Sequence, residues 1–130
     1  MDAVRARVDD RSGCDMNQDE VLARLAEVSA LLDAAVADVK AADERFVQAK
    51  QQFELAQARS FLSSEGSVEA RKQKMVLDAE QQQTAMDAAG VELRAGRERV
   101  SVLRAQLSML QTVSAALRQQ WQAEATGQWT

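Results

Sequence analysis

Four arginines in the second half of the chain are the residues best placed to do chemistry. Arg94, Arg97, Arg104 and Arg118 follow one another at intervals of three, seven and fourteen residues. Residues three or seven apart lie on the same side of an α-helix, so Arg97, Arg104 and Arg118 share one stripe. Guanidinium groups along a helix can contact successive phosphates of a nucleic-acid backbone. We call this set the arginine ridge. Solvated surface with flanking ion pairs is the simpler interpretation, and the ridge is a candidate surface for binding nucleic acid or a partner.

Two smaller groups of residues are further candidates for binding. Arg71, Lys72 and Lys74 form a basic patch beside a predicted turn. Trp121 and Trp129 near the end of the chain are candidate partner anchors, because large rigid side chains dominate binding hot spots. Trp121 is also expected to cap the end of the apolar seam described below. For Trp129, a polar tail that binds nothing is the equal alternative.

The sequence offers no set of residues that is typical of a catalytic site. The chain contains no His, so a Ser or Cys nucleophile lacks its usual base and a metal its commonest ligand. Adjacent acids such as Asp43 and Glu44 diverge by about 100° on a helix and do not converge on a substrate. Its glycines are isolated, so no phosphate-binding loop is present. We therefore predict no catalytic, cofactor-binding or metal-ligating residue, and a protein that is not an enzyme.

The charge distribution argues against nucleic acid as the main ligand. Residues 1–66 carry 13 acids and 8 bases, whereas residues 67–130 carry 7 acids and 8 bases, which gives the stated net charge of −4. The chain has no Tyr, and its three Phe are expected on or beside buried faces rather than stacked on bases. Nucleic-acid contact is therefore expected to be weak or indirect.

A seven-residue apolar repeat predicts the elements that position these residues. In each half of the chain, apolar side chains recur at alternating steps of three and four, which is typical of the seam of a coiled coil. We predict an all-α fold, a long antiparallel two-helix coiled-coil hairpin over 16–126, with helices at 16–62 and 68–125 and a turn at 63–67. Residues 1–15 are expected to form a flexible arm and 127–130 a tail. The alternative is one continuous helix through Gly66, because a single Gly costs only about 1 kcal/mol. The predicted seam residues are Val21, Leu25, Val28, Leu32, Ala35, Val39, Ala42, Phe46, Ala49, Phe53 and Ala56, then Val68, Met75, Ala79, Met86, Ala89, Leu93, Gly96, Val100, Leu103, Leu107, Leu110, Leu117 and Trp121.

The position of the turn predicts which residues face each other. In a hairpin that closes near Ser64, residues whose numbers sum to about 128–130 lie opposite. Arg94 and Arg97 are then expected near Asp33, and Arg104 near Glu27 or Arg24.

A second set of apolar residues lies off the seam, which makes the apolar face wider than two helices can bury. We therefore predict that the chain forms a homo-oligomer, such as a four-helix bundle of two hairpins. A different protein that covers the same face is the alternative. The residues of this second row are Leu22, Leu31, Val36, Val47, Leu55 and Leu62, then Val91, Val102, Met109 and Val113.

The expected location is the cytoplasm. No run of 18 or more apolar residues is present, so no membrane span is expected. Asp9, Asp10 and Arg11 stand where a signal sequence would need an apolar core. Cys14 is the only cysteine and is expected to be a free thiol.

Three stretches carry a resemblance to a known group of proteins. These stretches are EGSVEARK at 65–72, LRAQLSMLQ at 103–111 and ALRQQW at 116–121. They resemble small helical proteins encoded by bacteriophages near genes for DNA recombination or replication. The resemblance implies a phage-encoded accessory protein in the bacterial cytoplasm that assists a recombinase or a single-strand-binding protein. The alternatives are a protein-only binder that inhibits a host or defence protein and a structural component of the virion.

Overall fold

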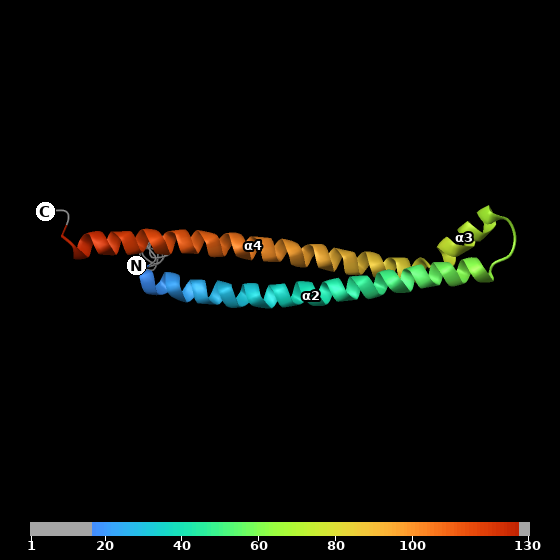
Figure 1. The fold of residues 1–130 in the computed structure, drawn as a ribbon, viewed down its shortest axis with the longest axis horizontal. Coiled ribbons are helices and arrows are strands. Elements are labelled where there is room, and N and C mark those ends of the chain that lie inside the picture. The colour runs from blue at the N-terminus through green and yellow to red at the C-terminus, as the bar shows by residue number, and fades with distance from the viewer. Residues whose placement is uncertain (1–16, 128–130) are drawn as a thin grey trace, which may run out of the picture. The chain divides into compact units, whose positions relative to one another are not determined.

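The computed structural model describes residues 17–127 and contains only helices over that range. Helix α2 spans Gln18–Ser63, α3 spans Val68–Asp78 and α4 spans Glu80–Ala125. Helices α2 and α4 lie side by side as an antiparallel hairpin (Figure 1). The predicted all-α hairpin is therefore confirmed. The predicted arm at 1–15, Cys14 and Trp129 lie outside the described residues.

Helix α2 begins at a side-chain cap. The backbone N–H of Glu20 donates to Oδ1 of Asn17 at 2.8 Å, and Nδ2 of Asn17 donates to the Glu20 carboxylate at 3.4 Å. One of the backbone donors that the first helical turn leaves unpaired is thereby satisfied. Asp19 and Glu20 in the first turn also interact favourably with the positive end of the helix dipole.

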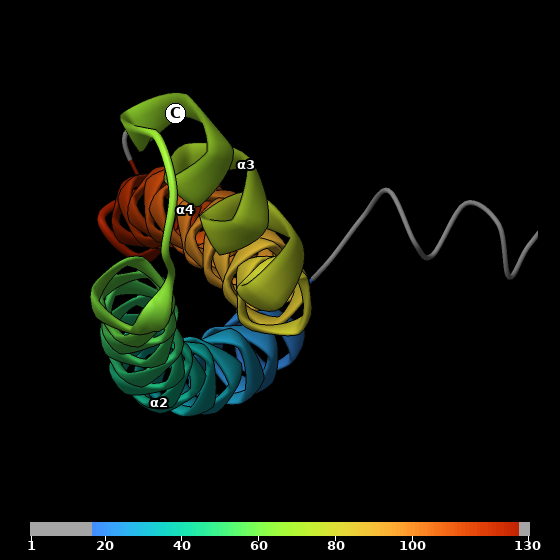
Figure 2. The same cartoon turned by 90° about the vertical axis from the view of Figure 1, so that its right-hand side faces the viewer.

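The chain reverses through four residues between α2 and α3. Ser64 is buried, and its hydroxyl donates to the backbone carbonyl of Phe61 at 3.1 Å. Gly66 has a φ of +107°, which a residue with a side chain rarely adopts. Ser67 caps α3 by accepting a hydrogen bond from the N–H of Ala70 at 3.2 Å. Figure 2 shows this turn end of the molecule, where the linker leads from α2 to α3.

The second predicted helix is divided in two, which corrects the expectation of one helix over 68–125. Ala79, with φ −99° and ψ 9°, interrupts it between α3 and α4. Most sharp bends arise at Pro or Gly, and neither is present near Ala79. The break instead coincides with tertiary contacts, because Ala79 is almost fully buried and Oδ2 of the adjacent Asp78 accepts a hydrogen bond from Ser60 of α2 at 2.7 Å. The apolar repeat predicts the burial of Ala79 but carries no signal of the hydrogen bond between Ser60 and Asp78.

The described chain divides into two compact units, one of residues 34–101 and one of residues 17–33 and 102–127. In each unit, a stretch of α2 packs against a stretch of α4 through the predicted seam. In the first unit the core contains Ala35, Ala42, Ala79, Leu93 and Val100. In the second unit it contains Val21, Val28, Leu103 and the polar Ser114.

Two of the predicted seam residues are exposed and take no part in the packing of the seam. Val68 is 60% exposed and Trp121 is 64% exposed. Val68 is the first residue of α3, which has no buried residue at all. Trp121 stands in the last turns of α4 and does not cap the seam as predicted.

The predicted pairing of facing residues is wrong by about one heptad. In the unit of residues 34–101, a Cβ added to Gly96 would lie 3.1 Å from Cγ2 of Val39, and one added to Gly90 would lie 3.4 Å from the ring of Phe46. Arg45 pairs with Glu92 at 3.6 Å. The numbers of these facing residues sum to 135–137 and not to 128–130. Gly96, the residue before Arg97, faces Val39. The expectation that Arg97 faces Asp33 is therefore wrong.

This shift accompanies the separate helix α3, which the break at Ala79 divides from α4. The 11 residues of α3 take up part of the chain that the prediction had assigned to the paired helix. A shift of seven residues returns the same seam positions to the same face, so the apolar repeat is compatible with both pairings.

The second row of apolar residues is exposed throughout, with exposed fractions from 38% at Leu31 and Val113 to 84% at Leu62. At about 100° per residue, however, its members on α2 lie on both flanks of the seam and do not form one stripe. Over residues 17–127, no helix has both the length and the hydropathy that crossing a membrane requires.

Candidate functional site

Five large apolar residues near the turn end of the hairpin are exposed. We call residues 59–78 the hairpin tip; they comprise the last residues of α2, the linker and α3. Large apolar residues there are exposed by 36–84%, while no residue of α3 is buried. These residues are Phe61, Leu62, Val68, Val76 and Leu77. Exposed apolar side chains that form one contiguous surface mark interaction sites, so these residues are candidates for binding.

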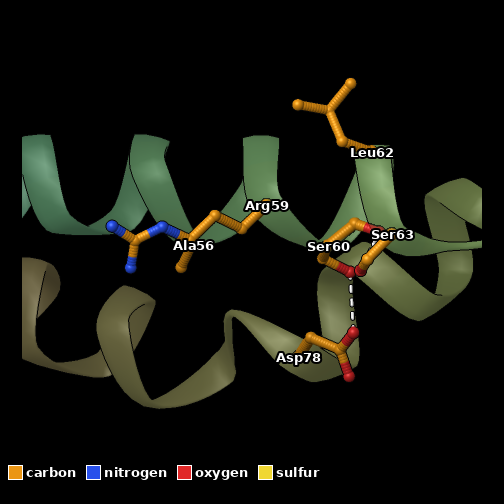
Figure 3. A pocket seen from close by; sticks show the side chains of 6 residues that line it. All are labelled: Ala56, Arg59, Ser60, Leu62, Ser63 and Asp78. Atoms are coloured by element: carbon orange, nitrogen blue, oxygen red, sulfur yellow. Dashed lines mark hydrogen bonds between the residues drawn. The ribbon is translucent and has the colours of Figure 1, made fainter.

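A hydrogen bond between two elements holds the hairpin tip together. Ser60 on α2 is 5% exposed, and its hydroxyl donates to Oδ2 of Asp78 at the end of α3 (Figure 3). The hydroxyl of Ser63 donates to the backbone carbonyl of Ser60 at 3.3 Å. A hydrogen bond to a charged group contributes more than a neutral one, about 1.5–3 kcal/mol. This bond ties the end of α3 to α2 although no residue of α3 is fully buried.

Beside this hydrogen bond lies an open pocket of about 580 Å³. Its walls are Ala56, Arg59, Leu62 and Ser63 together with the bonded pair. In Figure 3, the Leu62 side chain points away from Asp78. The walls of the pocket therefore include one cationic side chain and one exposed leucine.

The basic patch predicted at Arg71, Lys72 and Lys74 belongs to this tip, but its members differ in environment. The guanidinium carbon of Arg71 lies 5.7 Å from the centre of the Phe61 ring, within the range of a cation–π contact. Its Nε atom is buried without a hydrogen-bond partner. Lys72 and Lys74 are exposed and, two residues apart on a helix, project to different sides. Arg71 therefore packs against Phe61 within the tip, while the two lysines are exposed.

The arginine ridge is distributed over both units. Arg94 and Arg97 belong to residues 34–101, where they border a groove of about 420 Å³. Phe46, Gly90 and Leu93 also line this groove. Arg104 and Arg118 belong to the other unit, and both are exposed.

No arginine of the ridge has a salt-bridge partner among residues 17–127. The salt bridges of that range are Arg24–Glu27 at 2.9 Å and Arg45–Glu92 at 3.6 Å. Both of these pairs are largely exposed and contribute little stability. The flanking ion pairs considered for the ridge residues are therefore not formed there.

Val76 and Leu77 are the functional candidates that the sequence reasoning missed. They fall between the seam positions Met75 and Ala79, so the heptad repeat assigned them no role. Their only signal was that two large apolar residues stand off the seam next to a basic cluster. Over the described part of the chain, no three His, Cys, Asp or Glu side chains cluster as a metal site would require.

No family model, curated protein or solved structure matches this chain. Its function is therefore inferred from the residues and their geometry.

Proposed function

We propose that this chain is a non-enzymatic adaptor that binds another protein through the hairpin tip and associates with further copies of itself. The observation that carries the proposal is the exposure of Leu62 by 84% and Leu77 by 71% at the turn end, on and beside a helix without a buried residue. Burial of a leucine side chain in an interface is worth about 1.5–3 kcal/mol. A partner with an apolar surface gains this free energy at the tip.

The charged residues of the hairpin tip indicate what kind of protein surface it binds. Arg59, Lys72 and Lys74 are exposed around the apolar residues of the tip. Its three acids are Asp78, which already accepts the hydrogen bond from Ser60, and the exposed Glu65 and Glu69, so four bases against three acids leave the tip with a net charge of +1. Complementary charge speeds association and excludes wrong partners. The partner we propose is therefore an apolar protein surface with acidic residues at its rim.

A double substitution in the tip tests this proposal. Leu62→Ser together with Leu77→Ser should reduce capture of the partner from nuclease-treated bacterial lysate by at least about tenfold, because both apolar contacts are lost. Quantitative mass spectrometry of the captured proteins measures the effect. Both leucines are exposed, so helicity should remain unchanged.

The matched control moves the same change to other exposed apolar positions of α2. Val36→Ser together with Val47→Ser removes two side chains that are each 45% exposed and lie outside the tip. Capture should be retained by this variant. Equal capture by the tip variant, the control and the original chain would contradict binding through the tip.

A second candidate function follows from the arginine ridge. We propose that the protein is phage-encoded and assists DNA recombination or replication in the bacterial cytoplasm, with local contacts to the phosphate backbone. The observation in favour is that its exposed arginines have no salt-bridge partner among residues 17–127, so their guanidinium groups are available to phosphates. The resemblance to phage proteins near recombination genes supports the same reading.

Reversal of charge on the ridge tests this second function. Arg97→Glu with Arg104→Glu should weaken binding to a labelled single-stranded oligonucleotide by at least about tenfold at low salt, since two phosphate contacts become repulsive. Fluorescence anisotropy over a salt series measures the affinity. The control, Arg24→Glu with Arg45→Glu, has the same change in net charge at two salt-bridged arginines and should bind like the original chain.

The same two experiments separate the remaining hypotheses. Capture of one host protein from nuclease-treated lysate, together with no measurable oligonucleotide binding by the original chain, would favour the inhibitor of a host or defence protein. Recovery of the protein in purified virions would favour the structural component.

A further inference from the structure

The outer face of α4 carries a second apolar repeat within the unit of residues 17–33 and 102–127. We call the five residues Val102, Ala105, Met109, Thr112 and Ala116 the outer α4 face. They recur at alternating steps of three and four, which is the spacing of a coiled-coil seam. All five are exposed, with Val102 at 51% and Met109 at 62%. The inner seam of the same helix, which includes the buried Leu103 and Ser114, faces α2.

This outer repeat runs through a stretch without charge. The 13 residues between Arg104 and Arg118 contain no Asp, Glu, Lys or Arg, although 28% of the chain is charged. The hydroxyl of Thr112 donates to the backbone carbonyl of Ser108 at 3.1 Å, so it already has a partner when its methyl group is covered. Desolvation of this face therefore costs little free energy.

The lack of charge favours a second copy of this chain as the occupant. In a two-fold symmetric interface the residues beside the axis lie near their own equivalents in the second copy, so a charge there would repel itself. Met109 lies midway between Val102 and Ala116, so an axis beside Met109 sets the larger Val102 of one copy against the small Ala116 of the other and Met109 against its own equivalent. Alternation of large and small side chains allows two helices to approach closely.

We infer that two copies of this chain pair through the outer α4 face, with their α4 helices antiparallel and the two-fold axis beside Met109. This inference rests on the self-association proposed above and names the surface that carries it. The second copy places its Ala116 opposite Val102 and its Met109 opposite Met109. Arg104 and Arg118 are set apart from their own equivalents in this arrangement, so they do not repel.

A charge at the centre of this face tests the inference. The original chain should have the mass of a dimer or a higher even oligomer in sedimentation equilibrium, and Met109→Glu should weaken that association by at least about tenfold, because two carboxylates meet at the axis. The control Gln111→Glu adds the same charge at an exposed position about 200° around the helix and should leave the mass unchanged. Circular dichroism should show equal helicity for all three proteins, since Met109 is not part of the core.

The possible outcomes separate a failure of the outer α4 face from a failure of self-association as a whole. A monomeric original chain at about 100 μM, a concentration at which most specific dimers form, would overturn both. An oligomer whose mass is the same with Met109→Glu would overturn the outer α4 face and leave self-association standing. Neither result depends on the hairpin tip, which is tested separately by partner capture.

Cross-linking tests the symmetry of the pair. In a Cys14→Ser background, Met109→Cys should form a disulfide-linked dimer under mild oxidation, because a two-fold axis brings the two Cα atoms within the roughly 4.4–6.8 Å that a disulfide spans. Gln111→Cys in the same background should remain uncrosslinked. Equal cross-linking at both positions, or none at position 109 in an oligomer, would overturn the symmetric arrangement.

Discussion

Val28→Asp should lower the free energy of unfolding by about 4 kcal/mol, because it places a carboxylate in a fully buried seam position. Val28 is 0% exposed in the core between α2 and α4 of its unit. A domain of ordinary stability has about 5–15 kcal/mol in total, so the variant should lose most of its folded population on mild denaturation. Urea denaturation followed by circular dichroism measures the change.

The control for this variant is Ala26→Asp, which introduces the same side chain two residues away at an exposed position. No charged residue lies three or four positions from Ala26, so the new carboxylate meets no like charge on the helix surface. Its effect should remain within about 0.5 kcal/mol. Similar losses for both variants would mean that Val28 is not at the packed seam.

Gly96→Leu should destabilise the chain by about 2 kcal/mol, because the site opposite Gly96 has no room for a side chain. A Cβ there would already lie 3.1 Å from Cγ2 of Val39 and 3.9 Å from the Cα of Val39. The gain in helix propensity, about 1 kcal/mol for replacing Gly, offsets only part of this crowding. Ala88→Leu, at an exposed position of the same helix, should change stability by less than about 0.5 kcal/mol.

A double-mutant cycle tests whether Gly96 faces Val39. Val39→Ala removes the methyl groups that Gly96→Leu would meet, so the double variant should be more stable than the sum of the two single effects by about 1 kcal/mol. Leu32→Ala, which would be the relevant partner if facing residues summed to 128–130, should add to Gly96→Leu without coupling. Coupling at Leu32 and none at Val39 would contradict the observed pairing.

The hairpin tip shows where a periodic pattern stops being informative. The heptad repeat continues through Val68, Lys72 and Met75, which assigns α3 to the paired helix. In the structure no residue of α3 is fully buried, Arg71 and Met75 are half-buried, and Val68 is exposed. A repeat states which residues share a face of a helix, but not whether another helix lies against that face.

The arginine ridge shows the same distinction for charge. Spacing alone places Arg97, Arg104 and Arg118 on one side of a helix. Whether each guanidinium is paired depends on which acid the facing helix presents, and this follows from the pairing of α2 with α4. In its own unit Arg97 follows Gly96, which faces Val39, and Arg97 has no salt-bridge partner among residues 17–127.

The amino-acid sequence by itself determined the helices, the reversal near Gly66 and the seam, because periodicity, capping residues and glycine conformation act within a few residues of one another. Only the tertiary structure decided which heptad of α2 faces which heptad of α4. A translation by seven residues leaves the pattern unchanged, so the choice depends on contacts far apart in the chain, such as Gly96 against Val39 and Ser60 with Asp78. Those contacts also set the break at Ala79 and leave α3 exposed at the tip, where the proposed binding site lies.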